Sequence, residues 1–257
     1  MIHADSIASL LTTRRIGKPI TWQQNVVSTN DELRRRALGG APEGEVFGAE
    51  YQSGGKGRFQ RVWQSAAGEN LLFSIFLRPP IPPQQYPLFN FLAALAVTEA
   101  VDSCSANAAM LRWPNDVYLN GRKICGILSE TLPNNSGVII GIGVNVNQTN
   151  FHPELHNATS IAIESGRETD RGRLLHIILK ILDERYAAVI DEGWASLMDD
   201  WRSRWDGKGK QVEARNGHSI INGTAIAVAD DGALRIIQDN GTEIPLYAGD
   251  VTLHGTK

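Results

Sequence analysis

A stretch of twelve residues, QSGGKGRFQRVW at positions 52–63, combines three glycines with three cations. Glycine lets backbone amides approach a ligand closely, and Lys56, Arg58 and Arg61 can neutralise phosphate or carboxylate oxygens. The composition predicts a site for an anionic ligand, although an ordinary exposed loop would have the same composition. The stretch is not a P-loop, because no Gly-Lys pair is followed by Ser or Thr. It is not a dinucleotide fingerprint either, because Gln60 stands in place of the third glycine.

A second polar cluster, RWPND at positions 112–116, comes just before a predicted β-hairpin. The hairpin signal is Asn120-Gly121, which lies between two apolar runs and is typical of a two-residue turn. Such a turn would bring Lys123 back along the preceding strand, close to Asp116. A carboxylate and an ammonium group would then face a common site. The same pair could also be a surface ion pair of little energetic value, and the residues before it could simply form a bend.

Glycines recur in the segment GVIIGIGVNVN at positions 137–147, which is otherwise typical of a strand. Gly141, Gly143 and Asn145 fall on one face of that strand, because side chains alternate between the faces. Glycine weakens a strand, so its repeated use predicts the close approach of a flat or bulky group. A β-bulge or a tight helix contact is the alternative.

The elements that would position these residues belong to an α+β fold. A helix is predicted for residues 30–38, with Thr29 as its N-cap and Glu32 completing a capping box. Trp194, Trp201 and Trp205 fall mostly on one helical face, and we expect them in the core. The remaining elements predicted from apolar periodicity and turn residues are helices at 5–14, 86–103 and 174–189 and strands at 44–51, 70–77 and within 110–147.

The sequence changes in character after residue 207. Short β-rich runs at 211–214, 220–228, 233–237 and 243–247 are separated by the turn signals Asp231-Gly232 and Asn240-Gly241. This spacing predicts a small antiparallel barrel of about 50 residues. We therefore predict two domains, residues 1–206 and residues 207–257.

Composition restricts the class of protein. The 257 residues carry 25 Lys and Arg against 28 Asp and Glu, a net charge of −3, and 42% of them are hydrophobic. These values are typical of a globular chain and argue against bulk electrostatic binding to DNA. No targeting segment is evident, and the longest apolar stretch, 89–101, is too short to span a bilayer. Cys104 and Cys125 lack metal-site spacing and fit reduced thiols in a cytoplasmic protein.

Taken in order, these motifs resemble those of the biotin protein ligases. The family pattern has Ser-Thr-Asn, Gly-Arg-Gly-Arg, Lys-Trp-Pro-Asn-Asp and Lys-x-x-Gly-Ile-Leu. The chain has STN at 28–30, GKGR at 55–58, RWPND at 112–116 and KICGIL at 123–128. Each motif alone is weak, but the ordered set is specific and the resemblance covers about residues 22–253. It implies an α+β catalytic domain of the class II synthetase type, built on a mixed, largely antiparallel sheet, followed by a small SH3-like barrel.

The chain departs from the family pattern at three positions. Arg112 replaces a lysine, Lys56 replaces the first arginine of the loop, and Gln60 replaces a common glycine. An arginine in place of a lysine keeps the charge but exchanges a point donor for a planar fork. With room for only one short helix before residue 20, the chain resembles the ligases that lack an N-terminal DNA-binding domain.

The resemblance implies an ATP-dependent biotin protein ligase. Such an enzyme converts biotin and ATP to biotinyl-5'-AMP and pyrophosphate, and then transfers biotin to a lysine of a biotin carboxyl carrier protein, as in acetyl-CoA carboxylase. Mg²⁺ is expected only as the partner of ATP, because the sequence shows no dedicated set of metal ligands. His152 and His156 are four residues apart, but Pro153 and a displaced Glu154 between them do not fit a zinc helix. Dimers occur in the family, and exposed strands could pair here. Neither DNA nor a membrane is expected as a partner.

The resemblance also assigns the site residues. Those expected to bind biotin are Ser28, Thr29, Asn30, Gln52, Lys56, Gly57, Arg58, Lys123, Gly126, Gly141 and Gly143, and those expected to bind ATP are Lys56, Arg58, Arg61, Trp63, Asn115, Lys123 and Asn145. Gly141 and Gly143 would leave room for the fused rings of biotin, while Trp63 and Asn145 would contact adenine.

Three residues are expected to be catalytic. Arg58 and Lys123 would hold the biotin carboxylate against the α-phosphate and stabilise developing charge, and Asp116 would orient or deprotonate the acceptor lysine. The glycine-rich loop would close over the adenylate and exclude water. Two alternatives stay open, a lipoate or octanoate ligase or transferase of related architecture and a non-catalytic biotin-binding sensor.

Overall fold

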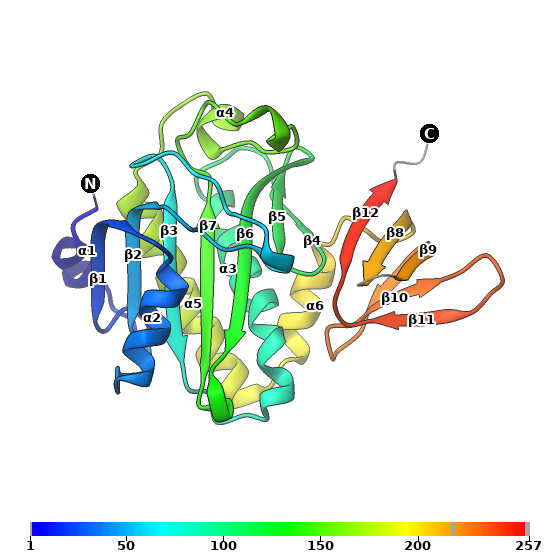
Figure 1. Ribbon diagram of the computed structural model, residues 1–257, viewed down its shortest axis with the longest axis horizontal. Helices are drawn as coiled ribbons and strands as arrows, with labels where there is room; N and C mark the ends of the chain where they lie inside the picture. Colours follow the sequence, from blue (N-terminus) through cyan, green and yellow to red (C-terminus); the bar gives the residue numbers. More distant parts are fainter. Residues whose placement is uncertain (1, 217–218, 255–257) are drawn as a thin grey trace.

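The main sheet of the protein has seven strands (Figure 1). The computed structural model describes residues 2–216 and 219–254. The strand order is β1-β2-β3-β7-β6-β5-β4, in which β1 and β2 are parallel and the other neighbours are antiparallel. The strands are β1 (Ile20–Val26), β2 (Val46–Gln52), β3 (Leu71–Leu77), β4 (Met110–Arg112), β5 (Asp116–Leu119), β6 (Arg122–Thr131) and β7 (Val138–Val144). The predicted mixed, largely antiparallel sheet is confirmed.

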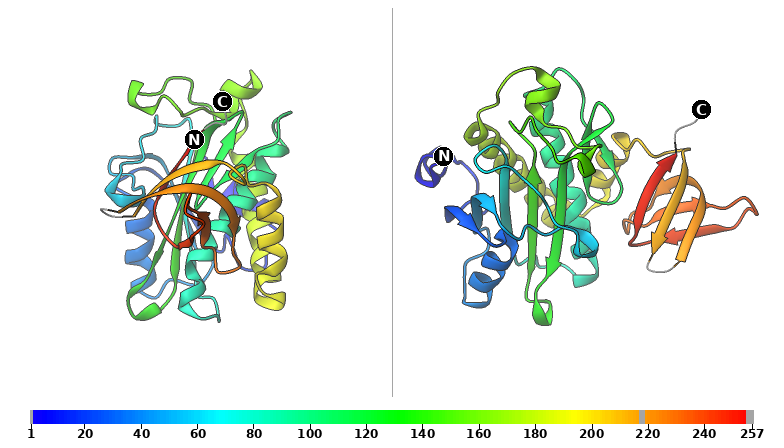
Figure 2. Two further views of the ribbon diagram at one scale, coloured as in Figure 1. Left: turned by 90° about the vertical axis from the view of Figure 1, so that its right-hand side faces the viewer. Right: turned by 45° about the horizontal axis from the view of Figure 1, so that its top comes forward.

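Helices cover both faces of this sheet. The α-helices are α1 (Ala4–Leu10), α2 (Thr29–Leu38), α3 (Phe89–Asp102), α4 (Ile161–Ser165), α5 (Arg171–Glu192) and α6 (Ala195–Ser203), and 3₁₀ turns occur at Arg58–Gln60, Pro83–Leu88, Pro133–Asn135 and Pro153–Leu155. The helices α3, α5 and α6 lie on one side of the sheet, and α2 lies on the other (Figure 2). Among the described residues, no helix combines the length and apolarity needed to cross a membrane.

The alternation of side chains along the strands explains how both faces are filled. Val46 belongs to the large core that includes α3 and α5, whereas its neighbour Phe47 packs with Leu33 of α2 on the other face. Trp201 and Trp205 stack with ring centroids 6.4 Å apart in the large core, as the sequence predicts. Because apolar side chains are buried on both faces, the sheet is a rigid support for the residues that project from its strands.

A second sheet contains five antiparallel strands in the order β11-β10-β9-β8-β12. The strands are β8 (Gln211–Asn216), β9 (Ser219–Val228), β10 (Leu234–Ile237), β11 (Glu243–Leu246) and β12 (Asp250–His254). Trp113 Nε1 donates to the Gly232 carbonyl at 2.8 Å, and Arg202 Nε donates to the Val228 carbonyl at 2.7 Å. The second sheet is therefore tied to the first. The four predicted β-runs are confirmed, β12 was missed, and the domain boundary at 207 stays a prediction.

Most of the predicted elements of the main sheet are confirmed, but the N-cap of α2 is not Thr29. Ser28 has extended backbone angles, and its Oγ accepts from the Asp31 amide at 3.4 Å. Thr29 is the first helical residue, and its hydroxyl turns toward the sheet, where its Oγ1 lies 2.8 Å from Ser74 Oγ. Both residues can cap a helix, so the choice depends on this contact with β3.

The first helix is also shorter than the predicted range of 5–14. It ends at Leu10 because the backbone after it turns to meet a carboxylate of α5. Asp183 Oδ2 accepts from the Arg14 amide at 2.6 Å, and Asp183 Oδ1 accepts from the Arg15 and Ile16 amides at 2.8 and 2.9 Å. Three backbone donors that would otherwise continue or cap a helix are thus bound by a residue far away in the sequence.

We predict that Asp183→Ala lowers the free energy of unfolding by about 2–4 kcal/mol, because three backbone amides, of which that of Ile16 is buried, lose a buried charged acceptor. The change is measured by urea unfolding at neutral pH. Asp191→Ala on the exposed face of the same helix is the control and should change it by less than about 0.5 kcal/mol. An equal effect of both substitutions would show that Asp183 does not hold the N-terminal segment.

Candidate active site

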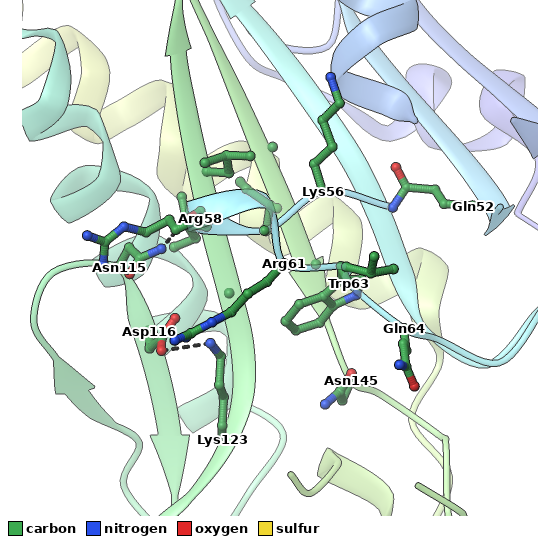
Figure 3. Close-up of a pocket in the computed structure, with 18 of the residues that line it drawn as sticks. Gln52, Lys56, Arg58, Arg61, Trp63, Gln64, Asn115, Asp116, Lys123 and Asn145 are labelled. Atoms are coloured by element: carbon green, nitrogen blue, oxygen red, sulfur yellow. Dashed lines mark hydrogen bonds and ion pairs between the residues drawn. The ribbon is translucent and has the colours of Figure 1, made fainter. Parts of the chain in front are cut away.

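Two adjoining cavities lie beside the first sheet and enclose about 1200 and 760 Å³ of empty space, including space open to solvent. They share a wall made by Arg58, Arg61, Asn115, Asp116 and Lys123 (Figure 3). The larger cavity lies over β6 and β7 and reaches the start of α2. The smaller cavity extends toward the 3₁₀ turn Pro153–Leu155 and the second sheet. The shared wall is therefore where two bound groups would meet.

The segment 53–63, which we name the cationic loop, has a defined path. The Gly57 amide donates to the Arg61 carbonyl at 2.8 Å, and the Trp63 amide donates to the Gly55 carbonyl at 2.9 Å. These bonds fold the loop back on itself and project the turn at Arg58–Gln60 over the site. Gln60 has a φ of 60°, in the left-handed region that costs a non-glycine residue about 1–2 kcal/mol. The family's glycine at this position would avoid that cost.

Trp63, at the end of the cationic loop, lies flat against two glycines of the sheet. A Cβ on Gly126 would be 2.8 Å from the indole, and one on Gly143 would be 2.6 Å from it. Gly141 instead makes room for the side chain of Asn30, whose Oδ1 would be 2.2 Å from an added Cβ. We expected Gly141 and Gly143 to leave room for biotin. In this structure two side chains of the protein, Trp63 and Asn30, lie beside these glycines, which themselves line the cavity. Their contact with biotin stays a prediction.

The four cations of the site differ in direction and in partner. Lys123 Nζ contacts Asp116 Oδ2 at 2.7 Å, which confirms the pairing predicted from the hairpin turn. Arg61 reaches toward the same pair in the view of Figure 3 and forms an ion pair with Asp250 of β12. Arg61 of the loop and Lys123 of β6 therefore lie together at the wall shared by the two cavities.

Arg58 and Lys56 are two residues apart in the cationic loop, and their side chains point in different directions (Figure 3). Arg58 donates to Asn115 Oδ1 at 3.3 Å and to the Gly249 carbonyl at 2.9 Å. Burial lowers the pKa of Arg58, and nearby carboxylates oppose that shift. Lys56 points away from Lys123 in Figure 3 and pairs with Asp31 of α2. Lys56 and Arg58 therefore both point away from the Lys123–Asp116 pair in this view, Lys56 toward α2 and Arg58 toward Asn115 and Gly249.

The end of the cavity near α2 is polar and neutral. Gln52 Oε1 accepts from the Thr29 amide at 2.7 Å and from Thr29 Oγ1 at 3.1 Å. Asn30 Oδ1 accepts from Ser74 Oγ at 2.6 Å, and Asn30 Nδ2 donates to Glu130 Oε2 at 2.7 Å. The network fixes both amide side chains in orientation. A ligand with amide-like donors and acceptors would find matching groups already in place.

The chain is matched by models of two families. Residues 22–147 match the biotin/lipoate A/B protein ligase family, and residues 208–253 match the biotin protein ligase C-terminal domain. The bifunctional ligase/repressor BirA of Bacillus spizizenii is 34% identical over 95% of this chain and 76% of its own. The biotin--[acetyl-CoA-carboxylase] ligase of Mycobacterium tuberculosis is 32% identical over 94% of this chain and 93% of its own. The chain belongs to the biotin protein ligase family.

A solved structure extends the likeness to the whole arrangement of elements. The biotin protein ligase from Aquifex aeolicus in complex with biotin and ATP has a TM-score of 0.81 and 26% sequence identity, over 93% of this chain and all of that chain. The 7% of the chain that lies outside the likeness is too little to omit either sheet as a whole.

Every predicted site residue of this ligase lines the larger cavity. These residues are Ser28, Thr29, Asn30, Gln52, Lys56, Gly57, Arg58, Arg61, Trp63, Asn115, Asp116, Lys123, Gly126, Gly141, Gly143 and Asn145. Sequence reasoning missed further lining residues, which are Val62, Gln64, Ile127, Leu128, Ile142, Phe151, Leu155, Ala158 and Asp250. The apolar ones give no chemical signal in a sequence, and Asp250 is brought in by the second sheet. Residue roles within the cavity are taken up as proposals below.

Arg112, a departure from the family pattern, does not line either cavity of this ligase. Its guanidinium carbon lies 3.8 Å from the centre of the Tyr118 ring, and its Nε donates to Asp206 Oδ2 at 3.0 Å. Arg112 thus contacts a residue at the junction between the two sheets. The planar guanidinium suits this stacked position against Tyr118, a residue that lines the smaller cavity.

Three buried polar atoms on the cavity wall lack a hydrogen-bond partner among the described residues. They are Trp63 Nε1, Asp116 Oδ1 and Asn145 Oδ1. An unpaired buried polar atom costs about 1–3 kcal/mol, so a group of them at one cavity is explained by a ligand that supplies the missing partners. The side chain of Asn145 is fixed in orientation, because its Nδ2 donates to the Thr159 carbonyl at 3.0 Å.

Proposed function

We propose that this chain is an ATP-dependent biotin protein ligase that forms biotinyl-5'-AMP and transfers biotin to a lysine of a carrier domain. The observation that carries the proposal is that Arg58, Arg61 and Lys123 all line the wall shared by two cavities. One cavity ends in neutral amide groups and the other opens beside a carboxylate. Membership of the family and the ligands named for its solved relatives support the same reaction.

The first step requires two anions to approach each other, because the biotin carboxylate oxygen attacks the α-phosphorus of ATP and pyrophosphate leaves. Two unit charges 4 Å apart repel by about 4 kcal/mol at an effective dielectric constant near 20. Arg58, Arg61 and Lys123 can offset this repulsion and stabilise the charge on the pentacoordinate phosphorus. Mg²⁺ would enter with ATP as part of the substrate.

The neutral end of the larger cavity suits the ureido ring of biotin. Gln52 and Asn30 present fixed amide groups there, and Ser28 is occupied as the helix cap. The apolar wall between this end and Lys123 is formed by Ile127, Leu128 and Ile142, which suits a hydrocarbon chain. We propose that biotin lies along this wall with its carboxylate at Lys123.

The adenylate would extend from this point past Trp63 and Asn145. We propose that Trp63 contacts the adenine ring and that Asn145 Oδ1 accepts from its amino group, because both have an unpaired buried atom on the cavity wall. The cationic loop would close over the mixed anhydride and exclude water, which would otherwise hydrolyse it.

In the second step, a lysine amine of the carrier attacks the carbonyl carbon of the anhydride, and AMP leaves. We propose that this lysine enters through the smaller cavity, where Asp116 faces it. Asp116 Oδ2 is occupied by Lys123, whereas Oδ1 has no partner among the described residues. Oδ1 can therefore accept a proton from the incoming ammonium group or orient the amine.

The carrier would be a biotin carboxyl carrier domain such as that of acetyl-CoA carboxylase. A relative named for that substrate supports this assignment. The outer edge of β1 is unpaired within the described sheet and could form a homodimer. We also propose a cytoplasmic location, since Cys104 and Cys125 are both free.

The proposed function is tested by incubating the purified chain with biotin, Mg²⁺-ATP and an unmodified carrier domain. We expect mass spectrometry to detect one biotinyl group on one lysine of the carrier. Lipoate or octanoate in place of biotin should give no addition. Modification by lipoate instead would make the chain a lipoate ligase, and tight biotin binding without any adenylate would make it a sensor.

We predict that Asp116→Asn separates the two steps. Synthesis of biotinyl-5'-AMP should stay within a few-fold of the parent rate, because the cations are retained. Transfer from preformed biotinyl-5'-AMP to the carrier should fall by about 10²-fold or more, the usual contribution of a positioned base. Both rates are measured on the same preparation by single-turnover kinetics. Equal losses in the two steps would contradict a role for Asp116 in transfer alone.

A further inference from the structure

The cations of the site already have acidic partners within the protein. The ion pairs are Lys56 with Asp31, Lys123 with Asp116, and Arg61 with Asp250. Anionic substrates must therefore compete with carboxylates of the chain, not only with water. Asp31 lies in α2, and Asp116 acts in the proposed transfer step. Asp250 takes part in neither half-reaction.

Asp250 is the first residue of β12, in the second sheet. It lines both cavities together with Arg61. The preceding Gly249 is tightly packed, since a Cβ there would be 2.8 Å from the Arg215 carbonyl oxygen, and its own carbonyl accepts from Arg58. The turn that presents Asp250 is thus fixed by the second sheet and contacts two arginines of the cationic loop.

The Arg61–Asp250 ion pair is exposed, so another anion can replace Asp250 at Arg61. The Arg61 side chain is 67% exposed and that of Asp250 is 30% exposed. Pairs this exposed contribute little to stability and are weakened by salt. By comparison, the Arg171–Glu50 pair has side chains only 11% and 2% exposed and is suited to a permanent structural role. A triphosphate, with several charged oxygens, can replace a single exposed carboxylate at Arg61.

We propose that Asp250 is a placeholder for the phosphates of ATP, a positioning residue that holds Arg61 at the cavity until a phosphate group takes its place. This inference rests on the proposed use of ATP. The second sheet then contributes directly to nucleotide binding, because it supplies the counter-ion that orders the cationic loop. Its negative charge also opposes ATP, so nucleotide binding requires the pair to break.

The proposal is tested with Asp250→Asn, which keeps the size of the side chain and removes its charge. We expect the KM for ATP in adenylate synthesis, and the Kd for ATP from calorimetry, to fall by about two- to fivefold at low ionic strength. The kcat should change little, because Arg61 is retained. The difference should disappear at about 0.5 M salt, where exposed charges are screened. In the free protein, trypsin should cleave at Arg58 and Arg61 faster than in the parent.

Two further variants control the experiment. Asp230→Asn removes another ion pair of the second sheet, with Arg202 of α6, far from the cavities, and should leave KM, Kd and cleavage unchanged. Asp250→Glu retains the charge and should keep the KM of the parent. An unchanged or raised KM and Kd in Asp250→Asn, or the same effect in Asp230→Asn, would overturn the proposal. A parent protein that binds ATP but makes no adenylate would instead overturn the proposed function.

Discussion

Repulsion between two anions is the constraint on which this site depends. A carboxylate and a triphosphate must come within bonding distance, and the chain as a whole carries a net charge of −3. Positive charge therefore has to be concentrated locally. The fold achieves this by placing the cationic loop and the β5–β6 hairpin side by side. Arg58, Arg61 and Lys123 therefore all line the wall shared by the two cavities. Carboxylates of the protein pair with Arg61 and Lys123, so the positive charge of the site is compensated before a substrate binds.

The remainder of the architecture gives these charges fixed positions. Apolar packing on both faces of the main sheet holds β5, β6 and β7, and two glycines of that sheet seat the Trp63 ring at the end of the cationic loop. The Lys123 amide donates to the Asn157 carbonyl at 2.8 Å, so the backbone of this lysine is held from the far side as well. The second sheet supports the turn at Arg58 through the Gly249 carbonyl. Preorganisation of this kind lowers the reorganisation needed during the reaction.

The local parts of the site could be predicted from the sequence, and the parts that depend on distant contacts could not. The Asn120-Gly121 turn fixes its own register, so the proximity of Lys123 and Asp116 followed from a few neighbouring residues. In contrast, Asp250 is brought to Arg61 by the packing of two sheets, and Ser74 of β3 reaches Asn30 of the helix α2 that packs on it. The cap of α2 and the end of α1 were mispredicted for the same reason, because Ser74 and Asp183 decide them from other elements.

The rate of biotinyl-5'-AMP synthesis by the Lys123→Ala variant is the most direct test of whether the cations at the shared wall promote the first step. Arg122→Ala is the matched control, since Arg122 is the neighbouring cation, pairs with Glu164 and lines neither cavity. If positive charge at the shared wall offsets the repulsion, Lys123→Ala should slow synthesis by about 10²–10³-fold and Arg122→Ala by less than about twofold. Adenylate formation by Lys123→Ala at the parent rate would contradict the central role given to these cations.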